Sequence, residues 1–308
     1  MKTKYTVSIG IPAFNEEKTI AQLLRSIFTQ RGNHFVLEKV YVGIDGSVDN
    51  TEKIVKKIHN THLKILKSSK REGKATRLNE FFKTSVSDIL IIFDADIIID
   101  DQYLIDKLTV QFNDKKIGLV SADNQPVCPA TFLGKTWYAS EKLWYEIRKN
   151  VNEGDSVYNN SGCSVAFRRE FARSINLPKE TIADQQFIYI YSVIKKWKFY
   201  FARNANIYYL PPSTWKDILT QFTRSLGEDN FFRKNFGTKW DEYFKIPKKN
   251  KFFGTIRSFI KDPFYTLAAI LLLFFLNSFV VVPNSQSTYG FWDSIESSKL
   301  INELKYEK

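Results

Sequence analysis

The first 125 residues alternate apolar, strand-like runs with stretches of helical spacing, and this rhythm constrains the fold more than any other feature. Alternation of strands and helices is typical of an α/β domain whose parallel strands are covered by helices. We therefore predict an α/β fold with a Rossmann-like, mostly parallel sheet flanked by helices. The predicted strands are residues 6–11, 39–44, 63–66, 89–93 and 118–121, and the predicted helices are 17–30, 50–58, 74–84 and 101–112.

Two carboxylates, Asp94 and Asp96, directly follow the apolar run 89–93. In open α/β sheets, ligands bind at the carboxyl ends of the strands. In an extended segment, residues i and i+2 point the same way, so these acids are expected side by side. Paired carboxylates suit Mg²⁺ or Mn²⁺, which take oxygen ligands and bridge to phosphates. The pattern predicts a divalent-cation site, and the alternative is a pair of solvated loop acids.

Composition narrows the class of protein. The 308 residues are 44% hydrophobic, which allows a substantial core and excludes a disordered chain. The two cysteines, Cys128 and Cys163, provide neither a disulfide framework nor a metal-binding spacing. No G-x-G-x-x-G follows the first predicted strand, which disfavours a dinucleotide-dependent dehydrogenase. The net charge of +12 is compatible with nucleic acid, anionic lipid or an anionic substrate.

Basic residues are concentrated between positions 245 and 261, immediately before the uncharged segment 264–282. Nineteen uncharged residues are close to the minimum for a membrane span, and the alternative is a buried helix of a soluble domain. We predict a basic amphipathic interfacial segment at 236–263, ended by Pro263, then a transmembrane helix at 264–282 and a tail at 283–308.

The same charge pattern predicts an orientation. By the positive-inside rule, the protein is expected in the cell membrane as a single-pass protein with its large N-terminal domain in the cytoplasm. The first eleven residues lack the apolar stretch of a signal peptide. Basic residues beside an apolar segment favour anionic lipid as the partner, so no nucleic-acid partner is expected.

Four loops at predicted strand ends carry polar motifs that would converge on one crevice of the sheet. The motifs are Pro12-Ala13-Phe14-Asn15-Glu16, Asp45-Gly46-Ser47-Val48-Asp49-Asn50-Thr51, Arg71-Glu72-Gly73-Lys74 and Asp94-Ala95-Asp96. Gly46 permits a tight turn, and Asp49 or Asn50 suits a helix N-cap. Each motif alone is also explained by a turn or a helix cap.

Together, the order and spacing of these motifs resemble the family 2 glycosyltransferases, which have the GT-A fold. The resemblance covers about residues 5–230 and extends through "NNSGCSVAFRRE" and "TIADQQF". It implies that residues 1–125 form the nucleotide-sugar-binding half of the domain and residues 126–235 the acceptor-binding half.

The resemblance also implies roles for individual residues. It assigns donor binding to Pro12, Ala13, Asn15, Glu16, Asp45, Lys74, Asp94, Ala95 and Arg224, metal ligation to Asp94 and Asp96, general-base catalysis to Asp184, and acceptor binding to Gly162, Gln221 and Ser225. A carboxylate at Asp45 suits the ring N–H of uracil, which favours a UDP-sugar. From the residues alone, Asp184 as a helix cap, Lys74 as a solvated residue and Asp45 as a turn former remain open.

Residues 221–225 resemble the Q-x-x-R-W motif of processive membrane synthases, but Ser225 replaces the Trp. This difference puts chain elongation in doubt and favours transfer of one sugar. We therefore expect a metal-dependent, inverting glycosyltransferase that uses Mn²⁺ or Mg²⁺. It would move a sugar from a nucleoside diphosphate to a hydroxyl or phosphate of a membrane-linked or glycan acceptor. The alternative is a catalytically silent nucleotide-sugar-binding or scaffold protein at the membrane.

Overall fold

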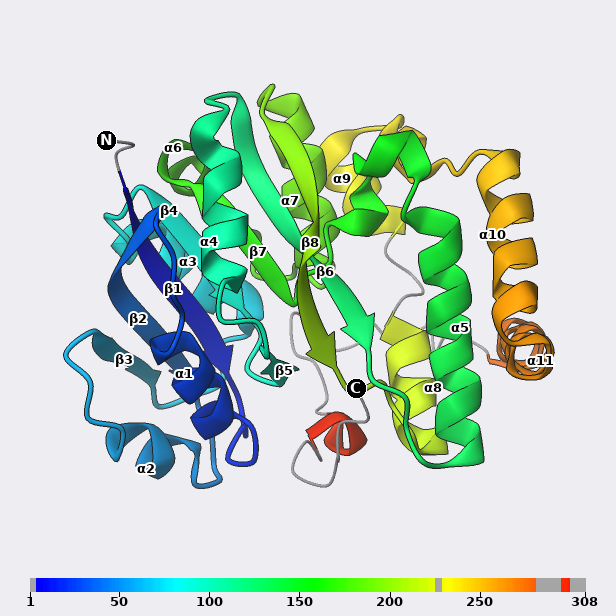
Figure 1. Cartoon of the computed structure of the whole chain (residues 1–308), viewed down its shortest axis with the longest axis horizontal. Helices are drawn as coiled ribbons and strands as arrows, with labels where there is room; N and C mark the ends of the chain where they lie inside the picture. Colours follow the sequence, from blue (N-terminus) through cyan, green and yellow to red (C-terminus); the bar gives the residue numbers. More distant parts are fainter. Residues whose placement is uncertain (1–3, 225–228, 281–294, 300–308) are drawn as a thin grey trace. The chain divides into compact units, whose positions relative to one another are not determined.

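The computed structural model describes residues 4–224, 229–280 and 295–299. They divide into two compact units (Figure 1). The first unit contains the described residues up to Gln125 together with Asn160–Tyr208. The second contains Pro126–Asn159 and the described residues from Tyr209 onward.

An eight-stranded sheet, built almost entirely from residues of the first unit, has the order β3-β2-β1-β4-β7-β6-β8-β5. The strands are β1 (Tyr5–Ala13), β2 (Phe35–Asp45), β3 (Leu63–Ser68), β4 (Ile89–Phe93), β5 (Ile97–Ile98), β6 (Ile117–Pro126), β7 (Ser164–Arg168) and β8 (Lys198–Tyr209). All five strands predicted in the first 125 residues are present. The 12-residue strand β8 was not predicted.

The sheet is mixed, so the prediction of a mostly parallel sheet is correct only for one half of it. Parallel pairing joins β1 to β2 and β4, and β2 to β3. Strand β7 pairs antiparallel with both β4 and β6. Strand β7 begins beside the end of β4, where Ser164 pairs with Phe93. This direction brings residues 160–163 to the carboxyl end of β4.

Helices cover the first unit on both faces of its sheet. One face packs on α1 (Ile20–Phe28) and α4 (Leu104–Thr109), which share a buried apolar cluster with β1, β2 and β4. The other packs on α3 (Lys74–Thr84), whose Phe81 lies so close to Gly43 of β2 that a Cβ there would fall 2.8 Å from the ring. The predicted helix at 74–84 is therefore confirmed. The other α-helices among the described residues of this unit are α2 (Thr51–Lys56), α6 (Arg169–Ser174) and α7 (Asp184–Ile194).

The second unit is mainly helical in its described part. Its α-helices are α5 (Phe132–Arg148), α8 (Trp215–Arg224), α9 (Asp229–Phe236), α10 (Lys248–Lys261) and α11 (Pro263–Phe279). Within the predicted amphipathic interfacial segment 236–263, residues Lys248–Lys261 form the helix α10, which ends before Pro263 as predicted, and the interfacial role stays a prediction. Asp262 has extended backbone between the two helices, and its side chain accepts a hydrogen bond from the Tyr265 N–H, which caps α11.

The predicted transmembrane helix at 264–282 is not confirmed. Helix α11 ends at Phe279, and residues 281 and 282 lie outside the described residues. Of the helices in the described ranges, none has both the length and the apolar character that a membrane crossing requires.

Candidate functional site

Lys74 lies between two of the acids that the sequence singled out. Its Nζ is 2.8 Å from Asp94 Oδ1 and 3.5 Å from Asp184 Oδ2. Lys74 is the first residue of α3, Asp94 follows the last residue of β4, and Asp184 is the first residue of α7. The structure thus brings together three residues from distant parts of the chain. Lys74 is a paired and largely buried side chain, which excludes the solvated alternative.

The charges of these three groups are coupled. Burial alone would lower the pKa of Lys74, but the carboxylates of Asp184 and Asp94 outweigh it and hold the pKa above its ordinary value. Burial raises the pKa of Asp184, and the positive charge of Lys74 opposes this increase only in part. Lys74 therefore stays protonated at neutral pH, and Asp184 is a stronger base than an exposed aspartate.

Gly162 lies beside Lys74, Asp94 and Asp184, which we call the ion group. A Cβ at Gly162 would fall 2.2 Å from Gln185 Oε1 and 3.6 Å from Lys74 Nζ, so only a residue without a side chain fits here without displacing Gln185. Asn160 Nδ2 donates to the Gln185 carbonyl over 2.6 Å, and the Asp94 N–H donates to the Cys163 carbonyl over 2.9 Å. The loop before β7 is thereby attached to both α7 and the end of β4.

Asp45 holds the loop that leads into Lys74. Its carboxylate is buried and accepts the N–H of Glu72 and the N–H of Gly73, each over 2.9 Å. Arg77 Nε lies 3.5 Å from the same carboxylate. Asp45 therefore does more than form its own turn. Each carboxylate oxygen has a second lone pair and can accept another hydrogen bond. The existing contacts are therefore compatible with the predicted contact to a nucleobase, which stays a prediction.

Gly46 is required by the packing of this loop. Its φ is +67°, a conformation that disfavours residues with a side chain, and a Cβ there would lie 2.6 Å from the backbone nitrogen of Arg71. The chain at residues 70–71 consequently lies directly against the turn after β2.

The predicted donor residues Pro12 and Ala13 are the last two residues of β1, and Asn15 and Glu16 lie in the loop that follows, which is bound to the segment after β2. Asn15 Oδ1 accepts the Val48 N–H over 3.0 Å, and the Glu16 N–H donates to Thr51 Oγ1 over 2.7 Å. These hydrogen bonds hold Asn15 and Glu16 at the carboxyl edge of the sheet, and pairing with β2 holds Pro12 and Ala13 there.

Two further residues at this edge were not among the predicted site residues. The guanidinium carbon of Arg71 lies 3.9 Å from the centre of the Phe14 ring, a cation–π contact. Both residues belong to motifs that the sequence analysis quoted. The signal that would have selected them is the presence of an aromatic and a basic residue in loops that meet at one sheet edge.

The acids Asp94 and Asp96 are not two residues of one extended segment, so that part of the prediction is wrong. Strand β4 ends at Phe93, and the chain turns at Ala95 and Asp96 to enter β5. Both carboxylates are partly exposed at the strand end.

A divalent cation bound by Asp94 and Asp96 would need further ligands from water and a substrate. Within the described residues, no group of three or more His, Cys, Asp or Glu side chains is arranged to hold a metal ion. Mg²⁺ is commonly held by one or two carboxylates together with water and substrate phosphates. The carboxylates of Asp94 and Asp96 match that arrangement.

The predicted acceptor residue Gln221 lies on α8 in the second unit. Its Nε2 is 3.4 Å from Oε1 of Glu141, a partly buried acid that also accepts hydrogen bonds from Trp137 Nε1 over 2.9 Å and from the Tyr209 hydroxyl over 2.5 Å. Burial raises the pKa of Glu141. The side chain of Arg224 and all of Ser225 lie outside the described residues, so their predicted roles stay predictions.

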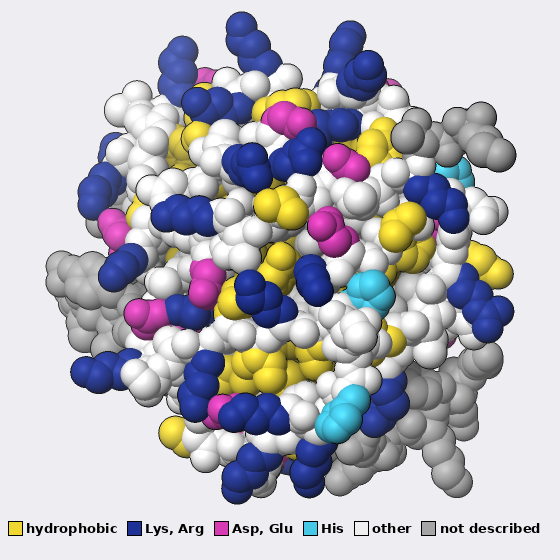
Figure 2. All heavy atoms as spheres, turned by 90° about the vertical axis from the view of Figure 1, so that its left-hand side faces the viewer, with side chains coloured by type: hydrophobic (Ala, Val, Ile, Leu, Met, Phe, Trp, Pro, Cys, Tyr) yellow, Lys and Arg dark blue, Asp and Glu magenta, His cyan; other side chains and the backbone are white. Residues whose placement is uncertain are grey.

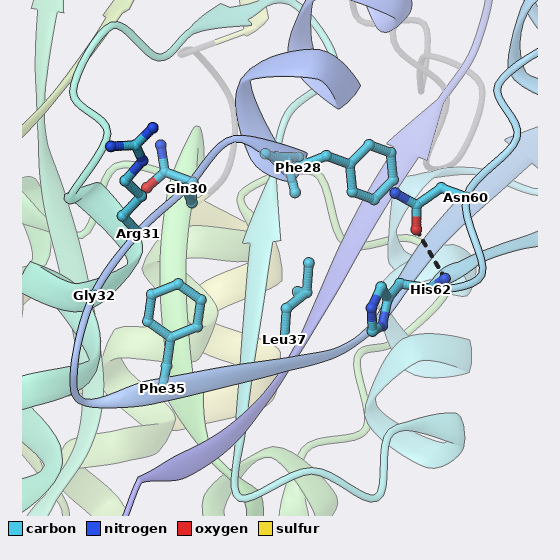
Figure 3. Close-up of a pocket in the computed structure, with 9 residues that line it drawn as sticks. Phe28, Gln30, Arg31, Gly32, Phe35, Leu37, Asn60 and His62 are labelled. Carbon is cyan, nitrogen blue, oxygen red and sulfur yellow. Dashed lines mark hydrogen bonds between the residues drawn. The ribbon is translucent and has the colours of Figure 1, made fainter.

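A pocket of about 460 Å³ lies at the opposite, amino end of β2 (Figure 3). Phe28, Phe35 and Leu37 form its apolar part, and His62 lies at one end. Its polar groups serve the fold, because Asn60 Oδ1 accepts the His62 N–H and His62 Nδ1 lies 3.0 Å from the Glu38 carbonyl. We therefore assign no catalytic chemistry to it.

The face of the first unit that includes β2, β3 and α2 shows no single basic stripe. Figure 2 shows Lys and Arg side chains spread over this face, with acidic side chains and small hydrophobic areas between them. Such a distribution does not resemble the concentrated basic surface that a nucleic-acid-binding protein uses.

Comparison with known proteins defines the class. The sequence model described as Glycosyl transferase family 2 matches residues 8–175, which is more than half of the chain. This protein therefore belongs to the family 2 glycosyltransferases, as the motifs predicted, and it is a glycosyltransferase.

Curated relatives match over a shorter stretch. Poly-beta-1,6-N-acetyl-D-glucosamine synthase of Staphylococcus epidermidis is 27% identical over 133 residues, which cover 42% of this chain and 31% of the synthase. The synthase of the same name from Staphylococcus aureus (strain COL) gives the same identity and coverage. The aligned stretch thus spans about a third of the length of these relatives.

Solved structures share the fold. The mannosyltransferase PcManGT from Pyrobaculum calidifontis, in complex with GDP-Man and Mn²⁺, has a TM-score of 0.59 and 17% identity, covering 91% of this chain and 77% of that one. Glucosyl-3-phosphoglycerate synthase from Mycobacterium tuberculosis, solved with Mn²⁺ and UDP, has a TM-score of 0.52 and 17% identity, with coverages of 72% and 79%. The described fold is accordingly a GT-A-like mixed sheet flanked by helices.

Proposed function

We propose that this glycosyltransferase moves a sugar from a nucleoside diphosphate sugar to a hydroxyl or phosphate of a membrane-linked or glycan acceptor. The observation that carries this proposal is the ion group at the carboxyl edge of the sheet. Lys74 contacts both Asp94, in the predicted metal motif, and Asp184, the predicted base. Donor-side and acceptor-side chemistry would therefore meet within a few ångströms.

The donor end would be held by residues at the ends of β1, β2 and β4. Asp94 and Asp96 would ligate Mn²⁺ or Mg²⁺, which supplies positive charge to the departing diphosphate when it is bound. Lys74 would add a second positive charge at the same place. The solved relatives that contain Mn²⁺ with GDP-Man or UDP support a nucleoside diphosphate donor. The carboxylate of Asp45 favours uracil, so we propose a UDP-sugar.

Asp184 would act as the general base. As the acceptor hydroxyl forms its bond to the anomeric carbon, its proton would pass to an Asp184 oxygen. The bond between the anomeric carbon and the phosphate oxygen would break, and the nucleoside diphosphate would leave with that electron pair. Attack opposite the leaving group inverts the anomeric carbon. A general base of this kind contributes about 10²–10⁴-fold to the rate.

We propose the cytoplasmic face of the cell membrane as the location, because the basic residues of α10 immediately precede the apolar helix α11. A lipid-linked acceptor would then be presented at the surface where the enzyme resides. The predicted single-pass span at 264–282 is one form that this attachment would take. Transfer of a single sugar is favoured over elongation, because Ser225 stands where the processive synthases have Trp.

A thermal-shift screen of nucleotide sugars, with and without Mn²⁺ or Mg²⁺, tests the donor assignment. A ligand that binds only the folded protein at a hundredfold excess over Kd stabilises it by about 2.7 kcal/mol. We expect a UDP-sugar to produce such a shift only when the metal is present. In Asp96→Asn, this metal-dependent thermal shift should disappear. An equal, metal-independent response to all nucleotides would contradict the assignment.

Turnover tests the chemistry. Incubation with the selected donor and candidate acceptors should release UDP and give a product of inverted anomeric configuration, which NMR can measure. Binding of the donor without release of UDP, across soluble and lipid-linked acceptors, would contradict the proposed acceptors. Retention of configuration would contradict single displacement with Asp184 as the base.

A further inference from the structure

The helix α10 has its small residues on the inside and its large apolar residues on the outside. Its buried residues are Gly254 and Ser258, whereas Phe252 and Ile260 are 63% and 77% exposed. Phe252, Ile256 and Ile260 recur every four residues and therefore form one stripe. A helix of a soluble domain has the opposite arrangement, with its large apolar side chains toward the core.

The helix α11 repeats this arrangement. Its buried residues are Thr266, Ala269 and Leu276, while Phe264 and Phe274 are 65% and 70% exposed. The inner side of α11 is covered by protein, because Leu276 packs in a buried cluster with Trp137 of α5 and with Ile218 and Phe222 of α8. Among the residues that the structure describes, the outer side of α11 is the side left uncovered.

Both helices lie on the same side of α5 (Figure 1). The contact of α10 with α5 is close, since a Cβ at Gly254 would fall 2.7 Å from the Cα of Ile147. A hydrogen bond of 3.1 Å from Thr266 Oγ1 to the Ser258 carbonyl joins α11 to α10. The exposed residues of each helix lie on the side opposite its buried residues and form one surface, at whose edge the Phe264 ring centre lies 6.3 Å from that of Phe132 of α5. We call this surface, which is made up of Phe252, Ile256, Ile260, Phe264, Leu271 and Phe274, the outer face.

Positive charge surrounds the outer face. Residues 245–280 contain six Lys or Arg and a single acid, Asp262, which caps α11. Lys248, Lys249, Lys251 and Arg257 are all exposed on α10. Anionic membrane surfaces attract basic segments of this kind.

A partly exposed tryptophan lies beside α11. Trp215 is 42% exposed, and its ring centre lies 6.1 Å from that of Phe275. Trp residues are enriched where a protein meets the headgroups of a bilayer.

We propose that the outer face binds an anionic lipid bilayer, with α10 and α11 both lying along the boundary between headgroups and acyl chains. This inference deepens the membrane location and rests on that part of the proposed function. A second copy of this chain is the less suitable occupant. A two-fold interface would bring the basic patches of two copies together, whereas anionic lipid neutralises this charge.

Co-sedimentation of the full chain with phosphatidylcholine vesicles, with and without phosphatidylserine, tests the occupant. We expect binding that requires phosphatidylserine and weakens at high salt. Phe252→Ser with Ile260→Ser, and separately Lys249→Gln with Lys251→Gln, should each weaken binding at least tenfold. The controls Val36→Ser with Val86→Ser, and Lys53→Gln with Lys57→Gln, change residues of the first unit that are also exposed and should bind like wild type.

Depth measurements test how α11 lies. Trp is introduced singly at Phe252, Leu267 and Phe274, and quenching by lipids brominated at shallow or deep acyl positions is measured relative to the unaltered chain. Similar shallow depths at all three positions are expected. A depth that increases steadily from Leu267 to Phe274 would overturn the proposal, because it indicates a helix that enters the bilayer.

Release of UDP from a soluble donor separates this proposal from the proposed chemistry. Variants that lose vesicle binding should keep donor turnover in detergent, because the outer face contains no residue of the ion group. Equal vesicle binding by wild type and all variants would overturn the membrane proposal and leave the chemistry intact. A dimer that the outer-face substitutions dissociate, without vesicle binding by wild type, would assign the face to a second copy.

Discussion

In the first unit, charged side chains lie inside: Lys74 contacts Asp94 and Asp184 next to a strand whose five residues are all buried. In α10 and α11 of the second unit, apolar side chains lie outside, and glycine, serine, threonine and alanine occupy most of the buried positions. Burying a charge is costly unless it is paired, and full burial of a Leu or Phe side chain is worth about 1.5–3 kcal/mol. The exposed apolar residues forgo the stabilisation that burial would give, whereas the buried charges are tolerated because they are paired. We propose that the buried charges serve chemistry and that the exposed apolar residues serve a partner outside the chain.

The largest expected effect is at Asp184, where a buried charge is assigned chemistry. Asp184→Asn keeps the size of the side chain and removes the proton acceptor, so we expect turnover to fall about 10²–10⁴-fold while the donor still binds. UDP release measures turnover, and thermal shift measures donor binding. The control Asp241→Asn changes an exposed acid of the second unit and should retain full activity. Nearly full turnover by Asp184→Asn would show that the buried acid is only structural.

The pH dependence of turnover tests the coupling between Lys74 and Asp184. Because protonated Lys74 stabilises the carboxylate of Asp184, Lys74→Met should raise the pKa of Asp184 further. The base acts when deprotonated, so turnover is lost as the pH falls through that pKa. The acid limb of the pH–rate profile should move to higher pH in the variant, with at least a roughly tenfold loss near neutrality.

The control for Lys74 is a variant that keeps the charge. Lys74→Arg should leave the acid limb close to its wild-type position even if the altered geometry lowers the rate. An unmoved acid limb in Lys74→Met would mean that Lys74 and Asp184 are not coupled in the working enzyme.

Gly46 tests how rigidly the first unit supports its site. Gly46→Ala combines a left-handed backbone, which costs about 1–2 kcal/mol, with a methyl group 2.6 Å from the Arg71 backbone. We expect a loss of at least about 2 kcal/mol in the free energy of unfolding, measured with denaturant. Gly237→Ala is the matched control: its φ is +78°, and within the described structure a Cβ there meets nothing within 4 Å. It should lose only about 1 kcal/mol, and equal losses would mean that the clash contributes nothing.

Local pattern was sufficient to predict much of the first unit. The apolar run 89–93 and the helix 74–84 coincide with β4 and α3, because strong periodicity and clear boundaries define both. The direction of β7 was not predictable in this way, since the side chains of parallel and antiparallel strands alternate with the same period. Strand β8 escaped prediction because Arg203 and Asn204 interrupt its alternation, so its pairing in the sheet decides its conformation.

The candidate site was predictable as a set of loops but not as a set of contacts. Strand ends and motif order placed Asp45, Lys74 and Asp94 at one edge, and the family resemblance added Asp184. Spacing alone did not indicate that Asp45 holds the loop before Lys74, or that Lys74 lies between the other two acids. Those facts depend on how α3 and α7 pack against the sheet. The turn at Asp96 likewise depends on β5, which has only two residues and therefore gives little sequence signal.

The smallest expected effect belongs to the outer face and completes the comparison within a single helix. Phe252→Ala with Ile260→Ala removes side chains that are already mostly exposed, so the free energy of unfolding should change by less than about 0.5 kcal/mol. On the inner side of the same helix, Gly254→Ala places a methyl group against the Ile147 backbone and should cost about 1–3 kcal/mol. Denaturant unfolding of both variants without lipid measures the contrast. A large loss from the outer pair would mean that Phe252 and Ile260 stabilise the fold itself, and the outer face would then need no partner.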